Sequence, residues 1–430
     1  MKFKKLLTGL LCAGMMFTMT ACNKSNTEEK TDNNKLTIWA WDETFNIKAA
    51  NEAANLYKKD NPDAEIEVVT MAQDDIIQKL NTSLSSGKTD GLPNIVLVED
   101  YRIQNYLTAY PDEFEDLSDI VNEKDFSSYK FAINKVNDKI YGVPFDSGVA
   151  GLFYRVDYLK EAGFEPKDME NITWERYIEI GKQVKEKTGH AMLTLDPSDL
   201  GQIRIMLQSA GSWYVNEDGE TVNIKDNEAL KQAITVYKNM IDAGIVEQVA
   251  DWDSFVGAFQ KGNVASVPSG CWIASSITAA EDQSGKWAVA PIPRLGENSN
   301  SVNASSIGGG GWYVLKNVDN ADKAKDFLAK TFASNADLMN TLAKEINLVS
   351  TYIPAAETEN YKSNNEFFSN QKTFENFSAW SEKIPSVNYG LHTYAIEDIL
   401  TEAVQAIVNG ADIDETLANA QQNAEGAIVK

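Results

Sequence analysis

From residue 36 onward, the apolar and polar positions of the chain alternate between two periods. Residues 36–41 read LTIWAW, an apolar run that predicts a buried strand. Apolar residues then recur three and four positions apart over 47–57, as they do on one face of a helix. A strand pattern at 65–69, a helix pattern at 76–84 and a strand pattern at 94–100 follow. This β-α-β-α-β order predicts a parallel sheet with helices on both faces.

The ends of these predicted strands carry aromatic and acidic side chains. Trp41, Asp42 and Glu43 follow the first strand, and Glu99 and Asp100 follow the third. Sheets of this kind bind ligands at the carboxyl ends of their strands, so these residues are candidates for a site. A second interpretation stays open for three of them, with Trp41 capping the core and Asp42 and Glu43 capping the following helix.

The second half of the chain continues in the same style without an internal repeat. Thr173 and Gly189 predict the two ends of a helix, and residues 190–195 predict a strand. Residues 213–224 predict a hairpin with Asp-Gly at its tip, and about 35 residues at the C-terminus read as helical. A chain of 430 residues is too long for one ordinary core, so two α/β domains or lobes are expected.

Composition and charge narrow the possible ligands. With 43% apolar and 24% charged residues, the chain is typical of folded globular proteins. Its 63 acidic residues exceed its 39 basic residues, and no basic patch with interleaved aromatic residues occurs. Such a surface repels nucleic acid, and it favours a neutral or cationic ligand over a phosphate.

The first residues predict export and anchoring. Three lysines, an apolar run over 6–17 and small residues before Cys22 are typical of a signal peptide over 1–21. The run MTAC at 19–22 resembles the lipobox of bacterial lipoproteins, with Met19 where leucine is usual. The resemblance implies cleavage before Cys22 and a lipid on its thiol, which anchors the protein to the extracellular face of the cytoplasmic membrane. Residues 22–35 are expected to be a flexible polar tether.

Cysteine and histidine are too few to support metal or nucleophilic chemistry. Once Cys12 leaves with the signal peptide and Cys22 carries the lipid, Cys271 has no partner for a disulfide and is expected to be a small buried side chain. Only His190 and His392 could activate it, and neither is near it in sequence. We therefore predict no catalytic residue, no metal and no cofactor.

One segment carries a family resemblance. Residues 139–166, KIYGVPFDSGVAGLFYRVDYLKEAGFEP, resemble a segment of the extracellular solute-binding proteins of carbohydrate ABC importers. Eight residues match that pattern: Gly142, Pro144, Gly151, Leu152, Phe153, Tyr154, Leu159 and Glu161. Arg155 departs from it, because Asn or Asp is usual there. The runs AFQKGNVASVPSGCW at 258–272 and IGGGGWYVLKN at 307–317 are similar to two further segments of the same family.

The resemblance implies a periplasmic-binding-protein-like α/β fold. Each of two lobes would hold a mostly parallel sheet flanked by helices, and the lobes would close on a ligand. The implied hinge crossings lie near 146–150, 291–295 and 350–355. The implied first lobe is 36–146 and 293–350, and the implied second lobe is 147–292 and 351–430.

A sugar site needs aromatic rings for the apolar sugar faces and carboxylates for the hydroxyl groups. Trp272 lies where the family usually holds a stacking tryptophan, and Trp41 is expected to face it from the other lobe. For Trp213 and Trp312 a packing role stays open. The candidate site residues are Trp41, Asp42, Glu43, Asp100, Asp146, Trp213, Trp272 and Trp312.

The leading functional hypothesis is a membrane-tethered, monomeric binding protein that is not an enzyme. It would capture an oligosaccharide and deliver it to an ABC permease. Among oligosaccharides, the sequence favours plant-type ligands such as xylo- or arabinoxylo-oligosaccharides. One alternative is an exported glycoside hydrolase, which also needs aromatic rings and two carboxylates. Another is a lipid-anchored carbohydrate sensor or adhesin domain.

Overall fold

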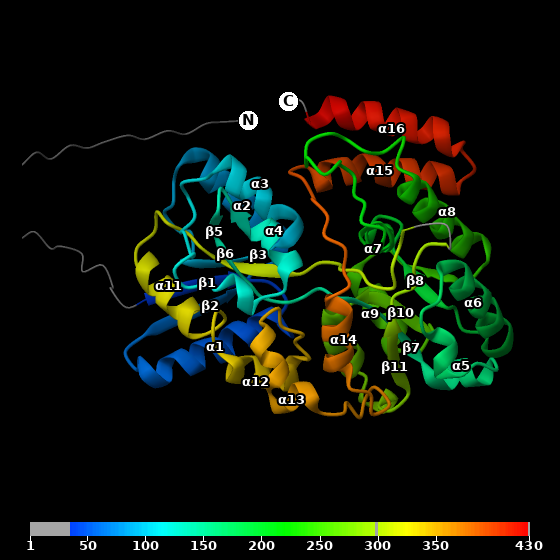
Figure 1. Ribbon diagram of the computed structural model, residues 1–430, viewed down its shortest axis with the longest axis horizontal. Helices are drawn as coiled ribbons and strands as arrows, with labels where there is room; N and C mark the ends of the chain where they lie inside the picture. Colours follow the sequence, from blue (N-terminus) through cyan, green and yellow to red (C-terminus); the bar gives the residue numbers. More distant parts are fainter. Residues whose placement is uncertain (1–34, 297–299, 429–430) are drawn as a thin grey trace, which may run out of the picture. The chain divides into compact units, whose positions relative to one another are not determined.

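The computed structural model describes residues 35–296 and 300–428 (Figure 1). The predicted signal peptide, Cys22 and most of the predicted tether lie outside these residues. Two sheets flanked by helices define two lobes within the described chain. The prediction of alternating strands and helices over 36–100 is confirmed, with strand and helix bounds close to those expected.

The first sheet has five strands in the order β2-β1-β3-β12-β6. β1 pairs in parallel with β2 and β3, whereas β12 runs antiparallel to β3 and β6. Four of the five strands therefore point the same way. The strands are β1 (Lys35–Ala40), β2 (Glu65–Thr70), β3 (Ile95–Glu99), β6 (Gly142–Pro144) and β12 (Gly310–Val314).

Helices cover the first sheet because each has one apolar face. α1 turns four alanines toward the sheet, and α2 ends at Gly87, which adopts the left-handed conformation (φ 64°) that favours glycine. The helices of this lobe are α1 (Asn46–Asp60), α2 (Gln73–Ser86), α3 (Asp100–Ala109), α4 (Phe131–Asn134), α11 (Ala321–Lys330), α12 (Ala336–Ile346) and α13 (Glu359–Lys362). Short elements complete it: η1 (Glu123–Asp125), η2 (Ser128–Lys130), η6 (Ile353–Glu357), β4 (Lys135–Val136) and β5 (Lys139–Ile140).

The second sheet is built around β7 (Ala150–Arg155). β7 pairs antiparallel with β10 (Ser266–Gly270) on one side and β11 (Trp287–Pro291) on the other. β8 (Leu193–Leu195) and β9 (Val246–Gln248) pair in parallel, and a parallel bridge between Ala191 and Val264 joins β8 to the strand that leads into β10. As in the first sheet, one strand, here β7, runs antiparallel to the others.

Each reversed strand is the first one after the chain crosses from one lobe to the other. β6 runs in the same direction as β1, β2 and β3, so the chain leaves the first lobe at the edge where these strands end. The next strand must therefore run away from that edge as it enters the second lobe. β7 is that strand, and β12 enters the first lobe in the same way. Antiparallel bridges between Val149 and Ser306 and between Asp146 and Ser350 hold the crossing segments together.

The second crossing lies later than the predicted 291–295. Residues 292–296 and 300–303 still belong to the second lobe, because Trp174 N donates to Arg294 O at 3.0 Å and Asn303 Nδ2 donates to Ile172 O at 2.8 Å. The return is made at about 304–309, so the first lobe resumes later than the predicted residue 293. The third crossing begins at 349–351, where Ser147 N donates to Val349 O. α13 then packs against α12, so residues 353–362 stay with the first lobe, contrary to the predicted boundary.

Helices surround the second sheet, with several ends as predicted. Thr173 accepts a hydrogen bond from Arg176 N, and Gly189 ends α6 in the left-handed conformation. The predicted hairpin is reduced to one bridge, between Val215 and Val222. The helices are α5 (Val156–Glu161), α6 (Trp174–Thr188), α7 (Gly201–Ser209), α8 (Glu228–Asp242), α9 (Trp252–Gln260), α10 (Ala274–Thr278), α14 (Thr373–Ser381), α15 (Thr393–Val408) and α16 (Ile413–Ile428), with 3₁₀ turns η3 (Pro166–Met169), η4 (Cys271–Ile273) and η5 (Glu281–Gln283).

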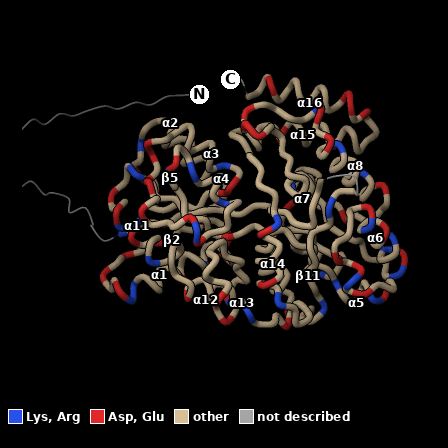
Figure 2. Tube along the Cα trace, in the orientation of Figure 1, with Lys and Arg blue, Asp and Glu red and all other residues tan. Residues whose placement is uncertain are grey.

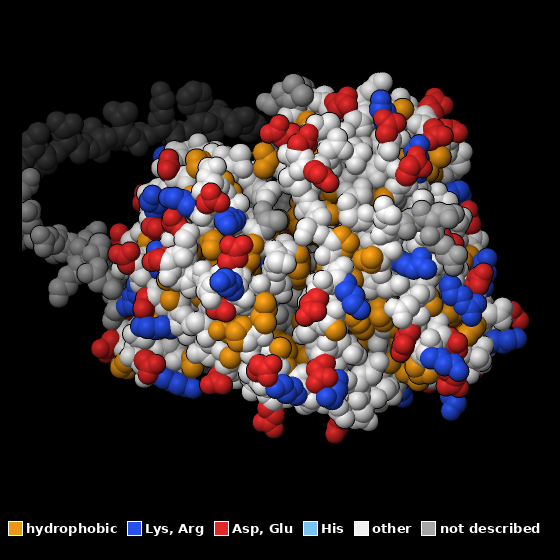
Figure 3. Space-filling model, in the orientation of Figure 1, with side chains coloured by type: hydrophobic (Ala, Val, Ile, Leu, Met, Phe, Trp, Pro, Cys, Tyr) orange, Lys and Arg blue, Asp and Glu red, His pale blue; other side chains and the backbone are white. Residues whose placement is uncertain are grey.

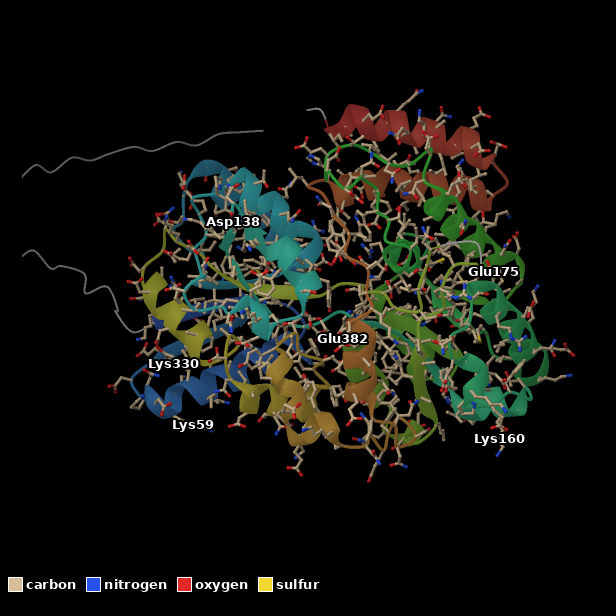
Figure 4. All side chains as sticks on the ribbon, viewed as in Figure 1. Lys59, Asp138, Lys160, Glu175, Lys330 and Glu382 are labelled. Carbon is tan, nitrogen blue, oxygen red and sulfur yellow. The ribbon has the colours of Figure 1, made fainter. Side chains whose placement is uncertain are left out.

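Basic and acidic residues both occur along the helices of the two lobes (Figure 2). On the face shown in Figure 3 they are mixed with polar and apolar side chains. The charged residues labelled in Figure 4 are all exposed: Lys59, Asp138, Lys160, Glu175, Lys330 and Glu382. None of the helices in the described part of the chain is both long and apolar enough to cross a membrane.

Candidate functional site

Residues from both lobes and from the crossing segments surround two adjoining cavities. The larger has a volume of about 820 Å³ and the smaller about 310 Å³. Four residues border both cavities: Glu99, Trp252, Trp272 and Gly308. We call the two cavities together the cleft.

The cleft lies where strands of both sheets end. β1, β3, β8, β9 and β10 each place residues in its wall immediately or shortly after their last residue. The cavities thus lie at the strand ends where the sequence predicts a site. These strand-end residues are Trp41, Asp42, Glu99, Asp196, Asp199, Asp251, Trp252 and Trp272.

Three tryptophans border the cleft with part of each ring exposed. Trp41 comes from the first lobe, and Trp272 comes from the second and borders the same cavity. Trp252 begins α9 and is 51% exposed. It stacks on Phe255 (centroids 5.5 Å apart, planes at 17°) and tilts toward Trp272 at 5.9 Å. Trp252 was not among the predicted site residues.

The crossing segment fixes the Trp272 ring. Trp272 Nε1 donates to Ile307 O at 3.0 Å. Gly308 follows with φ 67°, and a Cβ on it would lie 3.2 Å from Trp272 Nε1. A side chain at Gly308 would therefore strain the backbone and press on the indole. The glycine run at 308–311 borders the larger cavity with its first three residues.

Asp42 borders the larger cavity and organises the turn before α1, whereas Glu43 does not border the cleft. Asp42 Oδ1 accepts from Thr44 N at 2.9 Å and from Phe45 N at 3.2 Å, which organises the start of α1. Glu43 is exposed and lies outside both cavities, whereas Thr44, Phe45 and Asn46 after it border the larger one.

Asp146 and Asp100 occupy different depths beneath the crossing. Asp146 borders the larger cavity, and its Oδ1 accepts from Gly310 N at 2.8 Å. Asp100 is 3% exposed, pairs with the fully buried Lys130 and lies behind Gly309, outside both cavities. Burial raises the pKa of Asp100 to about 7, although the Lys130 ammonium opposes this shift. Burial likewise raises the pKa of Asp146. The structure thus gives Asp100 a structural position instead of the predicted site position.

Trp213 and Trp312 lie in hydrophobic cores, away from the cleft. Trp312 is completely buried because both faces of β12 are covered. Its ring stacks on that of Phe332, with the two ring centroids 5.0 Å apart. Trp213 is 1% exposed, donates to Thr393 Oγ1 at 3.0 Å and stacks on Tyr101 at 5.5 Å. Both therefore take the packing role that the sequence left open.

The smaller cavity contains polar residues that the sequence did not single out. Arg204 bonds Asp199 at 2.8 Å and Glu397 at 3.0 Å, and its guanidinium lies over the Tyr101 ring at 5.3 Å. Gln202 and Thr194 also border this cavity. Asp199 follows the strand predicted at 190–195, and that strand end was the signal that could have located the site.

The described residues contain no His, Cys, Asp and Glu cluster placed to hold a metal ion. Cys271 is buried, as expected, and burial raises the pKa of its thiol to about 12. Its neighbour is Ser147 Oγ at 3.5 Å. His190 instead stacks on Tyr158 at 4.2 Å. The thiol therefore has no activating base beside it.

Comparison with known sequences gives a consistent class. A family model for bacterial extracellular solute-binding proteins matches residues 52–369. The chain is 42% identical over 394 residues to the lactose-binding protein of Rhizobium radiobacter, covering 92% of this chain and 93% of that protein. It is 28% identical over 340 residues to the arabinooligosaccharide-binding protein of Bacillus subtilis (strain 168), covering 76% of each.

Solved structures share the fold. The GacH receptor of Streptomyces glaucescens, solved unliganded and with acarbose, matches with a TM-score of 0.77 at 20% identity, covering 92% of this chain and 99% of that one. The galacto-N-biose/lacto-N-biose I-binding protein of Bifidobacterium longum matches with a TM-score of 0.72 at 20% identity, covering 92% and 97%. The predicted two-lobed α/β fold is confirmed.

Proposed function

The chain belongs to the bacterial extracellular solute-binding proteins, and we propose that it captures a short oligosaccharide in the cleft and delivers it to an ABC importer. The observation that carries this proposal is the cleft itself, in which indole rings from both lobes border one cavity beside carboxylates. Rings suit the apolar faces of a sugar, and carboxylates suit its hydroxyl groups.

The relatives sharpen the ligand to a galactose-containing disaccharide or short oligosaccharide. The lactose-binding relative aligns over nearly its whole length, whereas the arabinooligosaccharide-binding relative is more distant. This proposed ligand differs from the xylo- or arabinoxylo-oligosaccharides that the sequence favours. Arabino-oligosaccharides remain the second candidate, because the B. subtilis relative also aligns over most of its length.

The test is a thermal-shift and calorimetric screen against lactose, galactobiose, lacto-N-biose, arabinotriose, xylotriose and maltotriose. A ligand that binds the native state raises stability by RT ln(1 + [L]/Kd), about 2.7 kcal/mol at a hundredfold excess over Kd. We expect the galactosides to give the largest shift. If none of these sugars raises the melting temperature, the proposed function is contradicted. If xylotriose raises it most, the ligand class is the xylo-oligosaccharides favoured by the sequence.

The proposal includes binding without turnover, by a monomer. Incubation of the protein with any sugar that shifts its melting temperature should release no monosaccharide. Enzyme-like release, at about 1 per second or faster, would instead support the glycoside hydrolase. Sugar uptake by membranes that contain the permease would separate an import role from a sensor or adhesin role.

Anchoring through Cys22 is the last part of the proposal and rests on the MTAC run. Cys22→Ser should leave a protein that is shed into the medium or retained as precursor, because the lipid-bearing thiol is gone. Membrane fractionation measures this, with Cys271→Ser as the control that removes a different thiol. Firm membrane association of the exported Cys22→Ser protein would refute the anchor.

A further inference from the structure

The acidic excess of the chain is concentrated in the cleft. Over the whole chain 39 basic residues face 63 acidic ones, and both signs appear among the exposed residues labelled in Figure 4. The described residues that border the two cavities include seven acidic side chains and a single basic one, Arg204. The acids are Asp42, Glu99, Asp146, Asp196, Asp199, Asp251 and Asp253.

The one positive charge at the cleft is already neutralised by the protein. Arg204 bonds the carboxylates of Asp199 and Glu397 on two of its nitrogens. Lys130 lies behind the glycine run and is paired with Asp100. A ligand that enters the cleft therefore meets carboxylates without a free cation among the described lining residues, and each negative charge on that ligand is repelled.

The smaller cavity also holds polar oxygens that have no partner. Gln202 is 9% exposed, its amide nitrogen donates to Pro268 O at 2.7 Å, and its Oε1 has no hydrogen-bond partner. Thr194 is 4% exposed, and its Oγ1 is likewise unpartnered. Buried polar atoms are normally satisfied, so these two mark a place where a ligand group that donates hydrogen bonds completes the wall.

The local structure keeps two of these carboxylates, Asp196 and Asp251, in place without consuming them. Asp251 Oδ1 accepts from Ser254 N at 2.7 Å as the N-cap of α9, and Asp253 lies in the first turn of that helix. Asp196 Oδ1 accepts from Ser198 N at 2.8 Å. Each cap uses one oxygen, so the second oxygen stays available to a donor. An ammonium group supplies three donors and a positive charge at one point.

We propose that the cleft selects for a cationic sugar, so that an oligosaccharide with a free amine binds more tightly than its neutral analogue, and an acidic analogue binds least. This inference rests on the proposed function, since it assigns a ligand class to the same cleft. It distinguishes hexosamine-containing ligands, whose amine is not acetylated, from their acetylated and hydroxylated counterparts.

Calorimetry with a matched ligand set tests the inference. The probes are lactose, lactosamine with a free amine, N-acetyllactosamine, and lactose oxidised to a carboxylate at galactose C6. At low salt and slightly acidic pH, lactosamine should bind about tenfold more tightly than lactose, the effect of one charge-assisted hydrogen bond. The carboxylate analogue should bind at least about tenfold more weakly, and at 1 M salt, where the screening length is about 3 Å, both differences should shrink toward twofold.

A triple variant isolates the carboxylates. Asp196→Asn, Asp251→Asn and Asp253→Asn together remove three charges, while asparagine keeps the oxygen that accepts from Ser198 N and Ser254 N. The variant should lose most of the lactosamine preference, measured as the ratio of the lactosamine affinity to the lactose affinity, because the lost charges act on the cationic ligand alone. Any loss of hydroxyl contacts lowers both affinities and leaves this ratio unaffected. The matched control replaces the exposed Glu161, Glu186 and Glu345, none of which borders the cleft, with glutamine.

The outcomes separate this inference from the proposed function. Lactosamine that binds more tightly than lactose, with the preference lost in the cleft variant and retained in the control, supports it. Lactosamine that binds no better than lactose, while lactose itself binds, overturns the inference and leaves the proposed function standing. Equal loss of preference in the cleft variant and the control overturns it as well, because the effect would then be one of overall charge. Failure of every sugar to bind overturns both.

Discussion

The core around Trp312 and the cleft wall around Trp272 contain the same side chain in opposite settings. Trp312 is fully buried between Phe145 at 5.4 Å and Phe332 at 5.0 Å, and its Nε1 has no hydrogen-bond partner. Trp272 is half-buried, its Nε1 is held by Ile307 O, and part of its ring borders the larger cavity. One ring is placed by packing alone, and the other by a hydrogen bond that leaves ring surface free.

The difference follows from strand direction. β10 runs toward the cleft, so Trp272, which lies in the 3₁₀ turn η4 directly after the strand, reaches the cavity. β12 is the reversed strand of its sheet and enters from the cleft, so its third residue, Trp312, already lies inside the lobe. Both sequences place tryptophan beside glycine in a strand-like run, and only the direction of the strand separates a wall residue from a core residue.

Truncation of the core ring should have the largest effect. Trp312→Ala should lower the free energy of unfolding by about 3 to 5 kcal/mol, because it opens a cavity between two phenylalanine rings. Urea unfolding monitored by circular dichroism measures this. Trp312→Phe is the matched variant and should cost less, since it fills much of the volume and removes an unpartnered N–H. A Trp312→Ala protein as stable as the parent would mean that the ring is not packed as described.

The buried acid behind the cleft should produce a pH dependence that its exposed neighbours do not. The pKa of Asp100 is raised to about 7, above its value of about 3.9 in an unfolded chain, so the native state holds a proton that the unfolded state releases. The proton on Asp100 therefore stabilises the native state at low pH. The free energy of unfolding falls by about 1 to 3 kcal/mol as the pH rises from about 4 to 7, because the native state then loses this proton.

Asp100→Asn should therefore flatten the fall in stability across that window, whatever the variant costs at a single pH through the loss of the Lys130 pair. Urea midpoints collected from pH 4.5 to 8 test this. Glu345→Gln, which replaces an exposed acid, should leave the slope unchanged. An unchanged slope in Asp100→Asn would assign the dependence to another buried group, with Asp146 next in line.

Truncation of either half-buried ring of the cleft should lower ligand affinity more than it lowers the free energy of unfolding. Trp41→Ala and Trp272→Ala should each weaken sugar binding by about 1 to 3 kcal/mol, the range found for flat ligand faces that stack on aromatic rings. Unfolding without ligand should change far less than it does in Trp312→Ala. Calorimetry and urea unfolding on the same samples separate the two quantities, and unchanged affinity in a folded Trp272→Ala protein would remove our strongest site residue.

Trp252 should show the smallest effect. It is 51% exposed and stacks on Phe255 at the start of α9, so Trp252→Ala should leave unfolding within about 0.5 kcal/mol of the parent. Loss of one ring contact with ligand should weaken binding by about 0.5 to 1.5 kcal/mol. Trp252→Phe should restore most of that affinity. A stability loss comparable to that of Trp312→Ala would place this ring in a core.

The first five elements could be read from the sequence because their signals are local. The apolar stripe at 47–57 and the strand pattern at 94–100 depend only on neighbours in the chain, and the structure has α1 and β3 there. Strand-end reasoning likewise selected Trp41 and Trp272, which both border the cleft. It missed Trp252 because β9 is only three residues long and leaves little periodicity to detect.

Other features depend on contacts between distant residues. Nothing local shows that β12 inserts between β3 and β6, so the depth of Trp312 could not be foreseen. The crossing predicted at 291–295 was placed too early because Arg294 O is held by Trp174 N, more than a hundred positions earlier. The pairing of Asp100 with Lys130 is equally invisible to a pattern of apolar residues.

The insertion of β12 also sets an order of events during synthesis. β3 and β6 leave the ribosome early, but the strand that joins them is made only after β7, β8, β9, β10 and β11 have appeared. Until then the first sheet is divided, and the edges of β3 and β6 have unpaired backbone groups. The sheet that is started first is therefore the sheet that is completed last. A ribosome stalled before residue 310 would hold a first lobe that cannot yet close its sheet.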